Sequence, residues 1–87
     1  MEIAVVRGEI ESLLKEIEKE NGMKRVILNV REEDEWYVVS TTVGSAVVSK
    51  KNIDEWILRR DLEARGEIKE AFRSAARFYK DSDRVYG

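Results

Sequence analysis

Residues 36–49 read WYVVSTTVGSAVVS, a run of aromatic and β-branched residues that Gly44 interrupts. Such residues fit a pleated strand better than a helix, and an isolated glycine is typical of a turn. The run therefore predicts two adjacent strands of one antiparallel sheet. Successive residues of a strand point to opposite faces, so Trp36 and Val38 share one face while Tyr37 and Val39 share the other. Both faces of this sheet are predicted to be apolar.

The residues before this run predict an amphipathic helix. Apolar residues between Ile3 and Ile17 fall on one arc of a helical wheel, and the charged residues lie outside it. Asn21-Gly22 is a typical helix end, since glycine readily takes the left-handed conformation there. One alternative stays open, in which residues 2–6 form a short edge strand and Gly8 is the turn into a shorter helix.

A third strand is predicted between this helix and the central run. Residues 24–31 alternate, with Val26, Leu28 and Val30 on one face. The acidic run at residues 32–35 then reads as a solvated loop, because it lacks the spaced ligands and the glycine turn of a Ca²⁺ site.

The carboxy-terminal part of the chain predicts helix. Asn52 followed by Glu55 resembles a capping box, with Ser49 as the alternative start. Gly66 either ends this helix or lies inside a longer one, because the apolar positions before and after it remain in phase. The expected fold is therefore a single α+β domain over residues 1–87, with a small sheet of about three strands, an amino-terminal amphipathic helix and one long or two short carboxy-terminal helices (α-β-β-β-α-α).

Composition predicts a folded chain of unusual origin. Hydrophobic residues make up 43% and charged residues 39%, which is enough apolar material for one small core. His, Cys, Pro and Gln are all absent. Depletion of thermolabile residues alongside abundant Glu, Lys and Arg is typical of a thermostable hyperthermophile protein. A de novo designed or engineered chain would have the same composition. Residues 5–8 and 81–87 do not look idealised, which favours the natural origin.

The same absences exclude several classes of function. Without His or Cys there is no Ser-His-Asp triad and no usual transition-metal ligand. The glycines stand singly, so there is no phosphate loop. No apolar run approaches the length of a membrane span, and no signal sequence is evident. We therefore expect a soluble, cytoplasmic, non-enzymatic domain of unknown function, with no catalytic residue, cofactor, metal or small-molecule ligand.

One basic pattern suggests an alternative, which is nucleic-acid binding. Cations recur at helical spacing along what we call the basic stripe, and Lys50 and Lys51 offer a second contact with phosphates. The stripe comprises Arg65, Lys69, Arg73, Arg77, Lys80 and Arg84. No aromatic residue is interleaved for base stacking, so a solvated or dimer-facing surface is the competing interpretation.

The order α-β-β-β-α, with Ser49-Lys50-Lys51 at the start of the second helix, resembles that of double-stranded RNA-binding domains. The resemblance implies contacts with phosphates from this helix start. Asp54 and Glu55 follow where a further basic contact would be needed, so the sequence does not assign the chain to that family.

Self-association is the remaining prediction. A small sheet with helices on one side should have a polar second face. Apolar residues are predicted on that second face as well, so another helix or a second subunit should cover it. The helix after residue 52 is apolar on two sides, and the carboxy-terminal pattern is long for so small a sheet. We therefore predict a homodimer. Its candidate interface residues are Trp36, Val38, Trp56 and Phe72.

Overall fold

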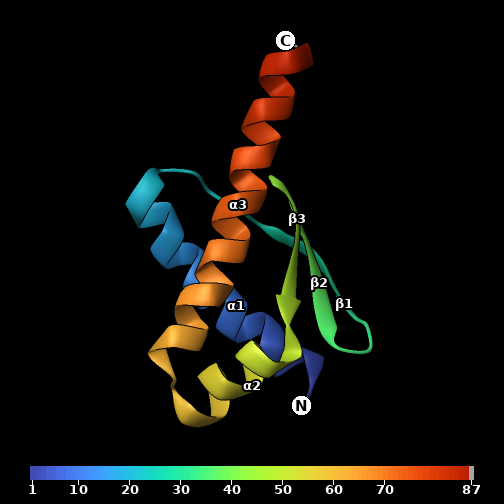
Figure 1. The fold of residues 1–87 in the computed structure, drawn as a ribbon, viewed down its shortest axis with the longest axis vertical. Coiled ribbons are helices and arrows are strands. Elements are labelled where there is room, and N and C mark those ends of the chain that lie inside the picture. The colour runs from blue at the N-terminus through green and yellow to red at the C-terminus, as the bar shows by residue number, and fades with distance from the viewer. Residues whose placement is uncertain (87) are drawn as a thin grey trace.

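The computed structural model describes the backbone of residues 1–86 and the side chains of residues 1–75. One helix precedes three strands, and two helices follow them (Figure 1). The elements are α1 (Ile3–Asn21), β1 (Ile27–Glu32), β2 (Trp36–Thr41), β3 (Gly44–Ser49), α2 (Lys50–Arg59) and α3 (Leu62–Tyr86). This order confirms the predicted α+β fold.

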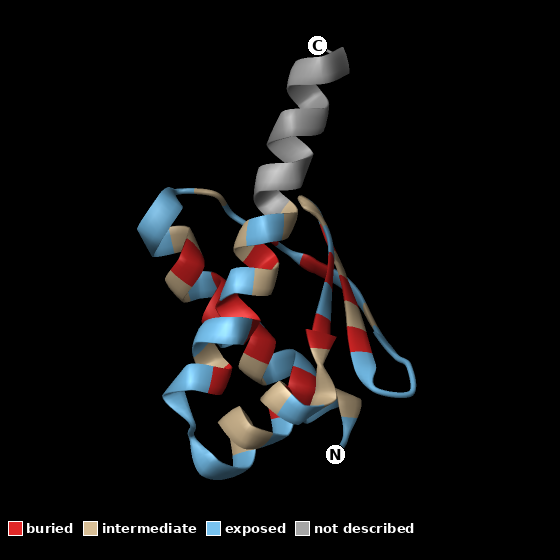
Figure 2. Cartoon of the chain, in the orientation of Figure 1, coloured by how far each residue is buried: buried red, intermediate tan, exposed pale blue. Residues whose placement is uncertain are grey.

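The strands form one antiparallel sheet in the order β1-β2-β3, so β2 lies in the centre. Helices α1 and α3 cover the same face of this sheet (Figure 1). Tyr37 and Val39 of β2, with Ala46 and Val48 of β3, are buried on that face (Figure 2). Among the described residues no element covers the opposite face, which we call the open face.

Helix α1 supplies the largest share of the core. Its buried residues recur at helical spacing and face the sheet and α3; they are Val6, Ile10, Leu13, Leu14 and Ile17. The helix ends at Gly22, whose φ of 71° is left-handed and whose N–H donates to the Glu18 carbonyl. The alternative of an edge strand over residues 2–6 is wrong, because Val6 reaches the core only from a helix in phase with Ile10.

Strand β1 differs from its predicted face pattern. The register with β2 shifts between Ile27 and Asn29, so β1 carries one extra residue, a β-bulge. Ile27 is buried and Val30 half-buried, whereas Val26 and Leu28 are exposed. The predicted apolar face of Val26, Leu28 and Val30 is therefore wrong, because strict alternation does not hold across a bulge.

Helix α2 begins at the alternative start. The hydroxyl of Ser49 accepts a hydrogen bond from the Asn52 N–H at 3.4 Å, which satisfies one of the free donors of the first turn. Asn52 lies within the helix, so the capping box predicted there does not form. Ile53 is the buried residue of α2 and anchors it to the core.

The break between the last two helices comes before Gly66. Arg60 ends α2 with a left-handed φ of 53°. Asp61 then caps α3, because its Oδ1 accepts from the N–H groups of Glu63 at 2.9 Å and Ala64 at 3.2 Å. Gly66 lies inside α3, so the turn considered at that glycine does not occur.

Candidate functional site

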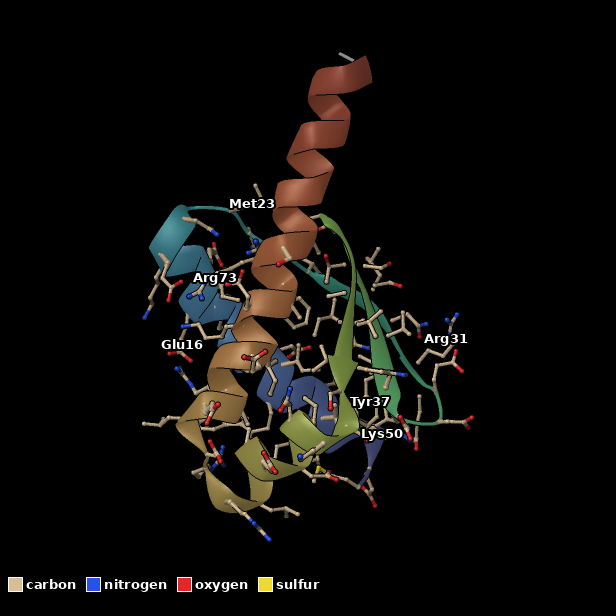
Figure 3. The ribbon with its side chains drawn as sticks, in the orientation of Figure 1. Glu16, Met23, Arg31, Tyr37, Lys50 and Arg73 are labelled. Carbon is tan, nitrogen blue, oxygen red and sulfur yellow. The ribbon has the colours of Figure 1, made fainter. Side chains whose placement is uncertain are left out.

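The first three cations of the basic stripe face α1 rather than solvent. We call their contact the α1–α3 seam (Figure 3). Arg65 pairs with Glu16, the Lys69 Nζ lies 2.8 Å from Glu20 Oε1, and the Arg73 Nη2 lies 2.5 Å from Glu20 Oε2. The other members of the stripe, Arg77, Lys80 and Arg84, lie outside the described side chains.

Glu20 is the centre of this seam. Hydrogen bonds from Lys69 first and from Arg73 second lower the pKa of the Glu20 carboxyl from 4.5 to about 2. Lys69 is itself buried, so its stem packs between the helices while its ammonium reaches the carboxylate. Phosphate would have to replace these carboxylates before it could bind the same cations. This half of the stripe therefore acts in helix packing.

The seam predicts a loss of stability in acid. Because the pKa of Glu20 is lowered in the folded state, its ionised carboxylate stabilises the fold at pH values above the ordinary pKa near 4.5. This stabilisation is lost as the pH falls toward about 2. We expect Glu20→Gln to lower the urea midpoint at pH 7 and to remove part of the decline between pH 4.5 and 2.

Urea unfolding at a series of pH values measures this effect. The control is Glu67→Gln, which removes an exposed carboxylate of α3 and leaves the seam intact. Identical pH profiles for wild type and Glu20→Gln would contradict the importance of the seam.

Lys50 is also paired within the chain. Its Nζ lies 2.7 Å from Glu32 Oε2 and 5.5 Å from the centre of the Tyr37 ring. The hydrogen bond with Glu32 raises the pKa of Lys50 and lowers that of Glu32. Lys51 is exposed on α2. Figure 3 shows Tyr37 and Lys50 together at one end of the sheet, away from Arg73, so the structure does not bring this lysine pair to the seam.

Two of the predicted interface residues are used inside the subunit. Phe72 is 1% exposed and belongs to the core, so its prediction as an interface residue is wrong. Trp56 is half-buried, and its ring lies beneath the guanidinium groups of Arg60 at 4.9 Å and Arg65 at 5.3 Å. Arg60 is fixed in turn by both carboxylate oxygens of Glu9, each at 3.2 Å. Trp56 thus has cationic partners within its own subunit, and its role as a dimer anchor stays a prediction.

The other two predicted interface residues lie on the open face. Trp36 is 47% exposed and Val38 is half-buried. The register pairs Val38 with Val47 of β3, which is 53% exposed, and with Arg31 of β1. Figure 3 shows Arg31 directed away from the helices. The centre of the open face is therefore apolar and accessible.

Comparison with protein-family models, curated proteins and solved structures found no match. The shared element order with double-stranded RNA-binding domains therefore carries no family assignment. Within the described part of the chain, no helix is both long and apolar enough to cross a membrane.

Sequence reasoning missed the acidic half of the seam. Glu16 and Glu20 are four residues apart on α1, which matches the spacing of Arg65 and Lys69 on α3. Charges of opposite sign at equal helical spacing are the signal that could have predicted this pairing. Val47 was also missed as an exposed residue of the open face, although its cross-strand partner Val38 was identified.

Proposed function

We propose that this chain is a non-catalytic domain that self-associates through its open face as a two-fold dimer. One observation carries the proposal: Trp36 and Val47 remain about half exposed beside Val38, in the apolar centre of a sheet face whose other positions include Asn29, Ser40 and Ser45. Exposed apolar surface that is contiguous usually marks an interaction site. The non-catalytic part of the proposal is supported by the lack of His and Cys in the sequence.

A second copy is the partner that this face suits best. A two-fold axis brings the same patch from each subunit together, so the patch must complement itself. The apolar centre meets this condition, because Val38 and Val47 can pack against their own counterparts. Beside it, Arg31 Nε lies 2.7 Å from Glu33 Oε1. Each subunit thus offers both signs of charge at the border, and the ion pairs can be exchanged across the axis.

The size of the open face limits the strength of this dimer. Three strands of six residues cover roughly 14 Å by 20 Å, or about 300 Å² per subunit. Stable interfaces bury about 800 Å² per partner. We therefore expect a weak, concentration-dependent dimer, with a Kd of about 0.1–1 mM.

Val47→Glu tests this assignment. It would place two carboxylates against each other near the two-fold axis, so we expect the dimer Kd to rise at least about tenfold. The monomer should stay folded, because the Val47 side chain is already half in solvent. Sedimentation equilibrium from about 20 µM to about 1 mM measures the change.

The matched control is Leu62→Glu, which adds the same charge at an exposed position of α3, away from the sheet. It should leave the Kd unchanged. A wild-type mass that stays at the monomer value of 10.1 kDa throughout would contradict the dimer. Equal weakening by both variants would contradict the use of the open face.

Nucleic-acid binding is the weaker alternative. Its candidate residues divide into three that the seam already engages, three outside the described side chains, and the Lys50–Lys51 pair, of which Lys50 is bound to Glu32. A phosphate backbone could reach the paired cations only after their ion pairs with Glu16, Glu20 and Glu32 had broken. Packing of the apolar centre of the open face breaks no ion pair, and the Arg31–Glu33 pair at its border can re-form between the subunits.

A further inference from the structure

Arg25 is a buried cation that pairs with no carboxylate among the residues whose side chains the structure describes. It lies between α1 and β1 and is only 7% exposed. Its Nη1 donates a long hydrogen bond of 3.5 Å to the carbonyl of Met23, which Figure 3 labels at the turn after α1. Its Nη2 is buried and has no hydrogen-bond partner among the described residues. An unpaired buried donor is costly, and more so when it carries charge.

Within the described side chains, the groups that act on Arg25 do not neutralise its charge. Burial lowers the pKa of the Arg25 guanidinium, and the nearby Arg73 cation lowers it further. The carboxylate closest to Arg73 in the seam, Glu20, is already shared between Arg73 and Lys69. Arg25 is therefore short of an acceptor, and its fork of N–H donors is suited to two oxygen atoms in one plane.

A cleft of about 200 Å³ lies beside this residue, between α1 and the start of β1; we call it the Arg25 cleft. Three further cations line it, namely Arg7, Lys15 and Lys24, against two carboxylates, Glu11 and Glu18. Glu11 is engaged by Arg7 at 3.3 Å, and Arg7 also donates to the Ile27 carbonyl at 3.2 Å. The charge balance of the cleft is positive.

The remaining wall of the Arg25 cleft is apolar. Leu14 and Ile27 are buried core residues that reach its surface, and Val26 is an exposed one. Small-molecule sites combine an apolar lining with a few placed polar groups, and this cleft has both. Its volume is below the usual range for drug-sized ligands, so it suits a smaller molecule.

We propose that the Arg25 cleft binds a small organic acid, with the carboxylate on Arg25 and an apolar body against Leu14, Val26 and Ile27. The carboxylate matches the planar guanidinium fork, and a turn of the Arg25 side chain toward the cleft on binding would bring the buried Nη2 to the ligand. The apolar body distinguishes this ligand from inorganic anions, which would leave the apolar wall of Leu14, Val26 and Ile27 uncovered. The proposal is independent of the dimer, because none of the open-face residues lines this cleft.

Benzoate is the probe, and amide shifts in two-dimensional NMR spectra of the full chain are the measurement. We expect saturable shifts at Leu14 and at residues 24–27, with a Kd of about 1 mM or below. Benzamide has the same shape without the charge and should bind at least tenfold more weakly. Inorganic phosphate has the charge without the apolar body and should give no saturable shift.

Arg25→Met is the decisive variant, because it keeps the length of the side chain and removes the fork. We expect it to weaken benzoate binding at least tenfold, and its spectrum reports directly whether it is folded. Lys51→Met, which removes an exposed cation of α2 outside the cleft, should bind benzoate like the wild type.

A second variant, Arg25→Lys, retains the charge without the planar fork and should bind with intermediate affinity. Equal binding of benzoate and benzamide, or undiminished binding by a folded Arg25 variant, would overturn the proposal. Phosphate binding as tight as benzoate would overturn it as well, because the cleft would then be a simple anion site.

Discussion

Replacing Phe72 with alanine should lower the free energy of unfolding by about 3–5 kcal/mol. Phe72 is 1% exposed and packs in the core between α3, α1 and the sheet, so its loss leaves a cavity that those elements cannot fill. A chain of 87 residues has a total stability of about 4–13 kcal/mol. The variant should therefore be close to unfolding at 25 °C, as urea denaturation followed by circular dichroism will show.

Leu62→Ala is the matched control. Leu62 lies on the same helix but is 76% exposed, so its truncation should change stability by less than about 0.5 kcal/mol. The pair also separates the core from an interface. A core role makes the loss at Phe72 independent of protein concentration. A loss that appears only at dimer-forming concentrations would return Phe72 to the interface predicted from the sequence.

The element order could be predicted because its signals are local. The α1 periodicity, the glycine at its end and the β-branched run each depend on residues near one another in the chain. Gly22 takes the left-handed conformation that Asn21-Gly22 suggested, and Tyr37 and Val39 share the buried face of β2 as alternation requires. Such patterns decide fold class without any knowledge of tertiary contacts.

The break between α2 and α3 depends on distant contacts and could not be placed by the same rules. Arg60 is not a residue that favours a left-handed φ, which costs about 1–2 kcal/mol outside glycine. Its bonds to Glu9 and its position over Trp56 offset this cost, and neither is visible in the sequence. Asp61, a good N-cap residue, was the local signal that could have placed the start of α3.

The candidate surfaces also depend on contacts between residues that are distant in the sequence. The spacing of the basic stripe correctly placed its first members on one side of a helix. Their partners Glu16 and Glu20 are about fifty positions away, so the pairing could be found only by comparing the charge spacing of two separate helices, and patterns within one helix did not show it. Arg25 was not predicted as a site residue, because a single arginine before a strand is common in sequences. Its burial and its unpaired Nη2 become evident only in the folded structure.

The double variant Gly8→Ala and Gly66→Ala should raise the free energy of unfolding by about 2 kcal/mol. Both glycines lie inside helices, and a β-carbon at either would meet nothing within 4 Å. Alanine in a helix interior is favoured over glycine by roughly 1 kcal/mol per site, and sites so far apart should add. For a domain of this size the melting temperature should then rise by about 8–16 °C.

Thermal unfolding of the two single variants and of the double variant measures this gain, and Gly22→Ala is the control. Gly22 has the left-handed φ of 71°, so alanine there should lower stability by about 1 kcal/mol even though space is free. Gly66 is the more informative site. If a turn occurred at Gly66 as the sequence allowed, Gly66→Ala would destabilise the chain as Gly22→Ala does. A gain at Gly66 equal to that at Gly8 requires a helix that continues through it.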